Sequence, residues 1–212
     1  MKDDRIIAVD CSLRLTCVAL MEDGRVVSSD VQDLGRRQAA ELPLMAERLV
    51  EGAGWAWGDV GLVAVGRGPG YFTGIRVGVA WASALAYGVS ACVVPVSSLE
   101  MLAASSGERG EILTVVYAGR GAVYAASFGA SDAMPEGERG AGEIAAWLAQ
   151  HEGAAIVSDD PERASRALEL DLPMRTVRPA PARLAELAWA RRGDAVSPFE
   201  VRPSYCRAPQ GT

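Results

Sequence analysis

A run of glycines in residues 66–78, GRGPGYFTGIRVG, constrains the fold more than any other stretch of the chain. A short apolar run at 62–65 precedes it, and an Ala-rich run follows to about residue 89. This order predicts a buried strand, a tight turn and a helix over about 73–87, with Thr73 as its N-cap. Glycine permits both a sharp turn and a close approach of other groups. We expect this pivot stretch, residues 66–78, to set the direction in which the helix leaves its strand.

A glycine-rich turn before a helix can also bind phosphate, but the two common nucleotide fingerprints are absent. A Walker loop needs Lys and then Ser or Thr after its last glycine, whereas Gly74 is followed by Ile75 and Arg76. The dinucleotide fingerprint fails because Gly70 and Gly74 are one residue too far apart. Two interpretations remain open, a structural turn, which we favour, and an anion site at the helix N-terminus. The candidates for a nucleotide or anion contact are Asp10, Ser12, Gly68, Gly70 and Thr73.

The helix that follows the pivot stretch is apolar on both sides. One face carries residues that would pack on the sheet, among them Ile75, Val79 and Ala82. The opposite face has only Arg76 and Ser83 as polar side chains, and a helix that is apolar all round is buried on both sides. Either another layer of the chain or another protein covers it. We favour another protein, because an exposed apolar patch with an aromatic anchor marks an interface. The predicted partner interface consists of Arg76, Val77, Ala80, Trp81 and Ala84, with Leu42 and Met45 from the preceding helix.

Alternating strand and helix patterns predict an α/β chain of two lobes, 1–103 and 104–212, and allow the last helix and the tail to pack back on the first lobe. Pro43 suits only the first turn of a helix, so the first helix is expected to become regular near that residue. Residues 131–140 are expected to be a polar loop, and Ser97 or Ser98 to cap a short helix. The predicted strands are 5–10, 16–21, 25–29, 62–65, 92–96, 112–117, 122–128, 154–158 and 175–178, and the predicted helices are 38–53, 73–87, 98–104, 141–150, 161–169 and 181–192.

Charge and composition exclude several classes of protein. The 212 residues carry a net charge of −6 with a pI near 4.9, which argues against an autonomous nucleic-acid-binding domain. The four cysteines are scattered, and the three that lie in apolar runs are expected to be buried. Because they are scattered, we predict no disulfide framework. The single histidine, His151, cannot form a metal-binding pair and is expected to be exposed, so we predict no metal site. We also expect no cofactor. The charged start leads directly into a strand, so neither a signal peptide nor a membrane-spanning segment is expected, and we interpret the protein as cytosolic.

Four short motifs resemble those of the TsaB (YeaZ) family. Residues 68–78, GPGYFTGIRVG, are similar to the family's GPGSFTGLRIG, and this match is highly specific. The first strand, with Asp10 and Ser12, resembles the family's opening Ile-Asp-Thr-Ser, and residues 96–100 resemble its Val-Ser-Ser-Leu-Glu. Residues 203–207, PSYCR, resemble a terminal Pro-x-Tyr-Leu-Arg. The resemblance is strong over the first half of the chain and thin over 128–197.

The resemblance implies a fold of two tandem actin-like (ASKHA, RNase H-like) lobes, with mixed sheets flanked by helices. It also implies a non-catalytic scaffold in the bacterial complex that transfers a threonylcarbamoyl group to N6 of adenosine 37 in ANN-decoding tRNA. The implied partners are a TsaD-like catalytic subunit, which carries the metal-binding histidines, and a TsaE-like ATPase, with tRNA contacted only through the complex. A member of this family pairs with itself when alone. The family interface would lie at the doubly apolar helix.

The sequence departs from the family pattern at three places. Arg37-Gln38-Ala39 stands where the family commonly has His-Ser-Glu, and residues 117–120, YAGR, stand where it has Asp-Ala-Arg-Arg. Tyr71 replaces a serine within the pivot stretch. The first two departures remove polar or acidic groups, which argues further against a nucleotide or metal role.

An actin-like small-molecule kinase or ATPase, with nucleotide bound between its lobes, is the alternative interpretation. Asp10 would then position the metal–nucleotide, whereas a structural Asp at a strand end accepts backbone hydrogen bonds, and we favour the structural role. Ser12 is not expected to be a nucleophile, because the only histidine lies in the other lobe. Tyr205 and Arg207 either contact a partner or tRNA, or simply dock the tail, which we favour. Titration of the isolated chain with Mg-ATP distinguishes a scaffold from a kinase, because only the kinase binds tightly and turns over.

Overall fold

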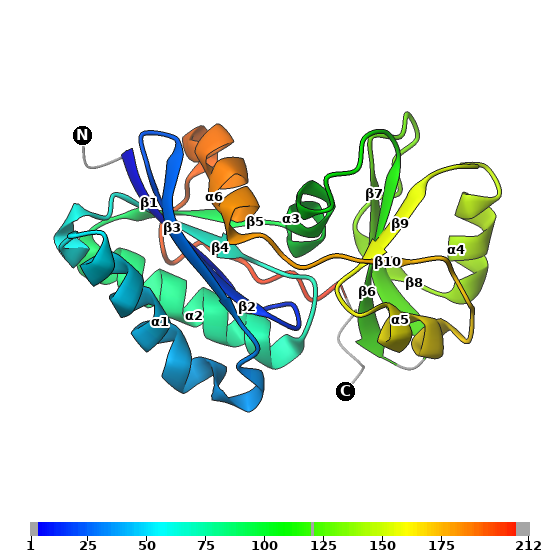
Figure 1. The fold of residues 1–212 in the computed structure, drawn as a ribbon, viewed down its shortest axis with the longest axis horizontal. Coiled ribbons are helices and arrows are strands. Elements are labelled where there is room, and N and C mark those ends of the chain that lie inside the picture. Colours follow the sequence, from blue (N-terminus) through cyan, green and yellow to red (C-terminus); the bar gives the residue numbers. More distant parts are fainter. Residues whose placement is uncertain (1–3, 120, 207–212) are drawn as a thin grey trace.

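The computed structural model describes residues 4–119 and 121–206, which form two lobes, each built on a five-stranded mixed sheet (Figure 1). In the first lobe the strand order is β3-β2-β1-β4-β5. β1 pairs antiparallel with β2 and parallel with β4, and β4 is parallel to β5, so β1, β4 and β5 all end at the same edge. The strands are β1 (Arg5–Asp10), β2 (Thr16–Glu22), β3 (Arg25–Gln32), β4 (Leu62–Gly66) and β5 (Cys92–Val96).

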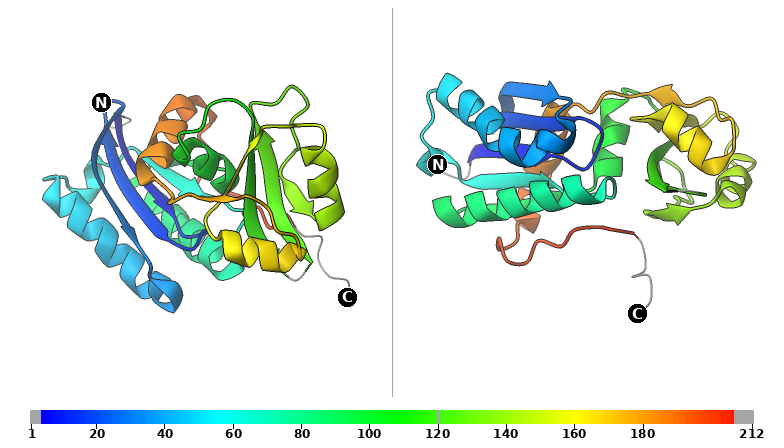
Figure 2. Two further views of the ribbon diagram at one scale, coloured as in Figure 1. Left: turned by 45° about the vertical axis from the view of Figure 1, so that its right-hand side comes forward. Right: turned by 90° about the horizontal axis from the view of Figure 1, so that it is seen from below.

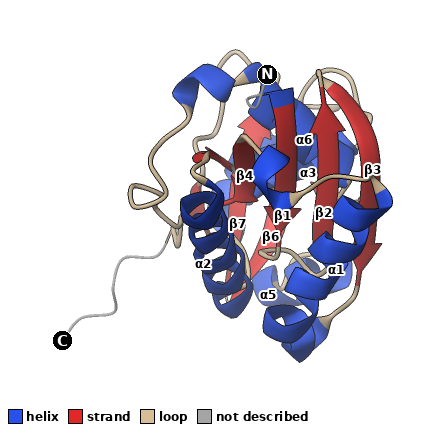
Figure 3. Cartoon of the chain, turned by 90° about the vertical axis from the view of Figure 1, so that its left-hand side faces the viewer, coloured by secondary structure: helices blue, strands red, loops and turns tan. Residues whose placement is uncertain are grey.

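Helices cover both faces of the first sheet (Figure 3). Along β1, Ile7 and Val9 face the core under α1 (Gln38–Gly52) and α2 (Phe72–Val89). Ile6 and Ala8 face the opposite core, under α3 (Ser98–Ser105) and α6 (Pro181–Ala190). Successive side chains of a strand point to opposite faces, so a strand buried on both faces must be apolar throughout. The last helix, α6, therefore returns to the first lobe, where it packs on β1 and β2.

The second lobe repeats this pairing pattern in the order β10-β9-β6-β7-β8. Here β6 pairs antiparallel with β7 and parallel with β9, as β1 does with β2 and β4. Helices α4 and α5 cover one face of this sheet, and α3 packs on the other and joins the two lobes (Figure 2). This arrangement confirms the predicted fold class. The elements are β6 (Ile112–Gly119), β7 (Ala122–Phe128), β8 (Gly137–Arg139), α4 (Ala141–Leu148), β9 (Ala155–Ser158), α5 (Pro161–Leu168) and β10 (Arg175–Thr176), with 3-10 turns η2 (Gly35–Arg37), η3 (Trp57–Asp59) and η4 (Arg192–Asp194).

Outside the pivot stretch, four local predictions are wrong. α1 is regular from its first residue, so Pro43 lies inside the helix, where it removes one backbone donor without ending it. The predicted polar loop over 131–140 contains the short strand β8. His151 is buried, because its ring stacks on Trp147 and its Nδ1 lies 2.9 Å from a Glu111 carboxylate oxygen. Cys92, the first residue of β5, is exposed, whereas the other two cysteines in apolar runs are buried.

Candidate functional site

The pivot stretch lies where β1 and β4 end, and three of its glycines touch the end of β1 and the loop that follows it. A Cβ atom on any of them would lie less than 3.0 Å from a neighbouring oxygen, a separation that real Cβ atoms do not show. Gly66 meets the Asp10 carboxylate, Gly70 the Ser12 carbonyl and Gly74 the Cys11 carbonyl. Two of the three neighbours are backbone atoms, which cannot rotate away. These contacts fix the first turn of α2 against the end of β1, and they favour the structural interpretation of the stretch.

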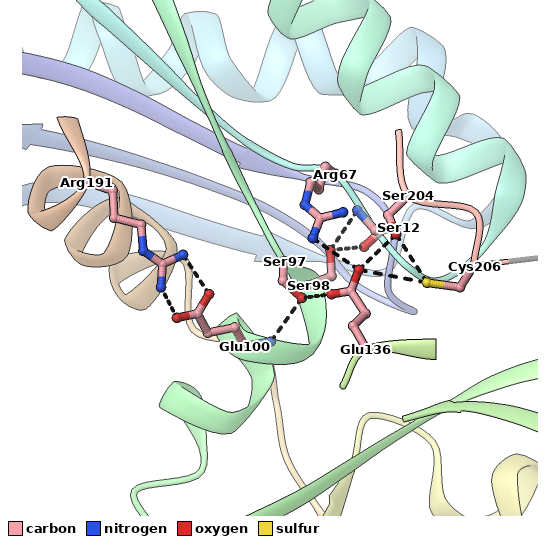
Figure 4. A network of polar contacts seen from close by, with 10 residues as sticks. Ser12, Arg67, Ser97, Ser98, Glu100, Glu136, Arg191, Ser204 and Cys206 are labelled. Carbon is pink, nitrogen blue, oxygen red and sulfur yellow. Dashed lines mark hydrogen bonds and ion pairs between the residues drawn. The ribbon is translucent and has the colours of Figure 1, made fainter. Parts of the chain in front are cut away.

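Asp10 is fully buried and its two carboxylate oxygens are occupied by the chain itself. The Ser12 amide donates to Oδ1 at 2.5 Å, and the Ser98 hydroxyl donates to Oδ2 at 2.8 Å. The same Ser98 oxygen accepts from the Ser12 hydroxyl at 2.6 Å and from the Gly68 amide at 3.2 Å (Figure 4). Burial raises the pKa of Asp10, and the hydrogen bonds from Ser12 and Ser98 oppose this. The carboxylate therefore links β1, the pivot stretch and the start of α3.

The five candidates for an anion contact do not form one site. Asp10, Ser12, Gly68 and Gly70 are buried together, and the side chains of Asp10 and Ser12 both bond to the Ser98 hydroxyl. Thr73 lies apart, exposed in the first turn of α2, and the predicted N-cap role is wrong because Tyr71 occupies that position. Across the described residues, no three His, Cys, Asp or Glu side chains cluster as metal ligands would. No helix in the described part of the chain is both long and apolar enough to cross a membrane.

The outer face of α2 is exposed, and nothing in the described part of the chain forms a further layer over it (Figure 3). Ala80, Ala84 and Gly88 are exposed and follow one another at intervals of four residues, while Val77 and Trp81 are half-buried beside them. A hollow of about 470 Å³ opens between this face and α1. It is lined by Ala39, Leu42, Phe72, Thr73, Arg76, Val77, Ala80 and Trp81.

Two of the predicted interface residues belong to the core instead. Leu42 and Met45 have no exposed surface, because the face of α1 that carries them packs on the sheet and on α2. They support the α2 face from below, and Leu42 forms part of the floor of the hollow. The exposed side of α1 carries Leu44 instead, with 48% of its surface accessible. Periodicity identified the apolar face of α1 correctly but could not show that the sheet already covers it.

Among the described residues that line the hollow, only Arg76 is charged. Its guanidinium lies 5.4 Å from the centre of the Phe72 ring, and Phe72 is itself 58% exposed. A guanidinium stacked on an aromatic ring keeps its donors free for a carboxylate or carbonyl. The hollow thus combines an apolar floor with one cation at its edge. Such a surface suits a protein partner that offers apolar side chains and an acceptor group.

The tail of the chain lies alongside α2 and adds aromatic residues at both ends of this helix (Figure 2). The Tyr205 ring lies 5.1 Å from Phe72, and the Phe199 ring lies 5.5 Å from Tyr87. The Ser204 amide donates to a backbone carbonyl of the pivot stretch, and Val201 is buried. Tyr205 therefore docks the tail, while Arg207 lies outside the described residues. Tyr87 and Phe199 are 68% and 72% exposed, and our sequence reasoning missed both.

Comparison with known proteins gives a consistent set of relatives. The family model described as TsaD, tRNA N6-adenosine threonylcarbamoyltransferase, matches residues 32–154, more than half of the chain. The chain is 31% identical over 127 residues to the tRNA threonylcarbamoyladenosine biosynthesis protein TsaB of Escherichia coli (strain K12), covering 58% of this chain and 54% of that protein. It is 33% identical over 216 residues to an uncharacterized protein of Mycobacterium tuberculosis (strain ATCC 25618 / H37Rv), covering 96% and 92%.

Solved structures agree with the sequence relatives. The crystal structure of an uncharacterized protein from Pseudomonas aeruginosa, described as similar to peptidase YEAZ, superimposes with a TM-score of 0.79 at 26% identity. The match covers 96% of this chain and 100% of that one. The chain spans about half the length of the curated TsaB relatives it matches.

Proposed function

Because the chain belongs to the TsaB (YeaZ) family, we propose that it is a non-catalytic scaffold subunit in tRNA threonylcarbamoyladenosine synthesis. The relatives carry the name of this pathway, and the matching family model carries the name of the transferase. The reaction is the transfer of a threonylcarbamoyl group to N6 of adenosine 37 in ANN-decoding tRNA. The chain supports it by holding the catalytic subunit in place.

The observation that carries this proposal is the exposed apolar face of α2. Small residues at positions 80, 84 and 88 form one row of the helix surface, and such a row lets a second helix approach closely. Trp81 lies half-buried at the centre, where a large aromatic side chain can contribute strongly to binding. The pivot stretch, with its glycines packed against backbone, holds this helix rigidly. A rigid apolar face is suited to docking a protein.

The polar groups near the pivot stretch support a scaffold more than an enzyme. Asp10 and Ser12, the residues best placed for chemistry, are buried and bonded to each other and to Ser98. A general base or a metal-binding carboxylate needs an open coordination or hydrogen-bonding position for the substrate. Both oxygens of Asp10 already accept hydrogen bonds from the chain.

We assign the partner at this face as a TsaD-like catalytic subunit, with helices packed across the interface. In the absence of that subunit, the same face pairs with a second copy of this chain. A TsaE-like ATPase joins the assembly, and tRNA is bound through the complex, consistent with the acidic charge of −6. The complex works in the cytoplasm.

Arginine substitutions on the α2 face test the docking surface. Ala80→Arg and Ala84→Arg place a charge at the centre of the proposed interface, while both positions are exposed in the isolated chain, so the fold should survive. An unpaired charge in an interface core costs roughly 2 kcal/mol or more, or about thirtyfold in affinity. We expect either variant to lose co-purification with the TsaD-like subunit and to run as a monomer in light scattering.

Ala145→Arg is the matched control, because Ala145 is also an exposed helical alanine but lies on α4 in the second lobe. It should bind the TsaD-like subunit as the unmodified chain does. If Ala84→Arg co-purifies with that subunit at the unmodified yield, α2 is not the docking helix.

A further inference from the structure

The second lobe contacts the turn of the pivot stretch at both of its ends. Arg67, just before the turn, pairs with Glu136, and Tyr71, just after it, contacts Arg163. Glu136 lies between β7 and β8 and Arg163 lies on α5, so both partners belong to the second lobe. Between Arg67 and Tyr71 lie only Gly68, Pro69 and Gly70. The segment that directs α2 is therefore held from two sides.

The first contact is a half-buried cluster centred on Glu136 (Figure 4). One carboxylate oxygen lies 3.1 Å from Arg67 Nη2 and accepts from the Ser204 hydroxyl at 2.8 Å. The other oxygen accepts from the hydroxyl of Ser97, the N-cap of α3. The Glu136 side chain is 19% exposed and that of Arg67 is 33% exposed, so solvent screens this pair less than an ordinary surface pair. One carboxylate thus joins the pivot stretch, α3 and the tail.

The second contact is an aromatic clasp around Arg163. The guanidinium lies 5.2 Å from the centre of the Tyr71 ring and 4.2 Å from the centre of the Tyr117 ring, and its Nη1 donates to the Tyr71 hydroxyl at 3.4 Å. The two rings are 6.5 Å apart. Tyr71 and Tyr117 are two of the positions at which this sequence departs from the family pattern. They lie far apart along the chain, yet both contact the same cation.

Tyr71 connects this clasp directly to the docking helix. It is the N-cap of α2, its carbonyl accepts from the Ile75 amide at 3.0 Å, and its own amide donates to the Ser12 carbonyl at 2.7 Å. A displacement of Tyr71 must therefore move the first turn of α2. We propose that the second lobe fixes the direction of α2 by holding the pivot stretch at both ends, through Glu136 and Arg163. The lobe then serves as a conformational support for α2, whatever partner the helix binds.

Hydrogen exchange of the isolated full-length chain, followed by mass spectrometry, tests this support. Arg163→Ala removes the clasp and Glu136→Ala removes the ion pair, and alanine suits the helix at position 163. Each variant should speed amide exchange in peptides that cover residues 68–75 by roughly twofold to fivefold, the scale set by partly exposed cation–π and ion-pair contacts. The double variant should exceed either single one. Exchange in α4 should not change.

Arg166→Ala is the matched control. Arg166 lies one turn further along α5 and lines the same hollow of about 670 Å³ as Arg163, but its Nε donates to the backbone of its own helix. It should leave exchange at 68–75 unchanged. Unchanged exchange there in Arg163→Ala and Glu136→Ala overturns the proposal, as does a uniform acceleration that includes α4. This readout needs no partner protein, so its failure is separate from a failure of the proposed function.

Discussion

Two glycines of α2, one helical turn apart, should respond in opposite ways to the same substitution. Gly74 lies in the first turn of α2 and Gly78 follows at the next turn, and both face the loop after β1. A Cβ on Gly74 would lie less than 3.0 Å from the Cys11 carbonyl oxygen, whereas a Cβ on Gly78 would have its nearest neighbour, Cys11 Cβ, at 3.5 Å. The first separation is a clash with backbone, and the second is an ordinary van der Waals contact.

The two free-energy terms can be compared for each site. Replacing glycine by alanine inside a helix stabilises it by up to about 1 kcal/mol, through the lower entropy of the unfolded chain. Overpacking against a core that cannot yield costs about 1–3 kcal/mol. At Gly74 both terms apply, and because the clash is with backbone the overpacking cost lies in the upper part of its range, about 2–3 kcal/mol, so Gly74→Ala should destabilise the chain by about 1–2 kcal/mol. At Gly78 only the first term applies, so Gly78→Ala should be neutral or stabilising by up to about 1 kcal/mol.

Urea denaturation followed by circular dichroism measures this difference. The midpoint should fall for Gly74→Ala and stay level or rise for Gly78→Ala, with similar slopes for both variants. If Gly74→Ala is as stable as the unmodified chain, the pivot stretch does not need its close backbone contact. If both variants lose the same stability, general helix effects explain the result and the geometric reasoning fails.

Two further predictions concern ionisable groups. Burial raises the pKa of Asp159 to about 6, above its ordinary 3.8. Between about pH 4 and 6, Asp159 is therefore protonated in the native chain but ionised in the unfolded chain. The free energy of unfolding should therefore fall as pH rises through that window, by at most about 3 kcal/mol from this group. Urea denaturation at several pH values should show a smaller fall for Asp159→Asn. If the free energy of unfolding falls with pH as steeply in this variant as in the unmodified chain, the assignment is wrong. Burial raises the pKa of the Cys11 thiol to about 12, and Cys17 is buried as well. A thiol reagent should therefore modify the exposed Cys92 quickly in the native chain, and Cys11 and Cys17 only after unfolding. Rapid labelling of Cys11 in the native chain refutes this.

Local sequence patterns were sufficient for most of the fold. Alternation of buried side chains along β1, the turn at 66–78 and the apolar faces of α2 all depend on residues close together in the chain, so periodicity and turn chemistry report them. The same periodicity predicted that α2 has a second apolar face pointing away from the sheet. His151 shows where this fails, because its burial depends on Glu111, which lies 40 positions away.

The supports of the pivot stretch could not be predicted for the same reason. The contact between Tyr71 and Arg163 spans 92 positions, and that between Glu136 and the tail spans 68. Tyr71 appeared in the sequence only as a departure from a family pattern, with no sign of its partner. Similarly, the burial of Leu42 depends on how α1 packs against the sheet and α2. Pairings between distant segments need the three-dimensional arrangement.

The most direct test of the central claim is the threonylcarbamoyladenosine content of tRNA after reaction with purified components. The reaction contains unmodified tRNA, a threonylcarbamoyl donor, ATP and the TsaD-like and TsaE-like proteins of the same cell, with or without this chain, and the nucleosides are measured by mass spectrometry. We predict modified adenosine only when this chain and the TsaD-like protein are both present, and none when Ala84→Arg replaces the unmodified chain. Modified adenosine formed by this chain without the TsaD-like protein would contradict a scaffold role.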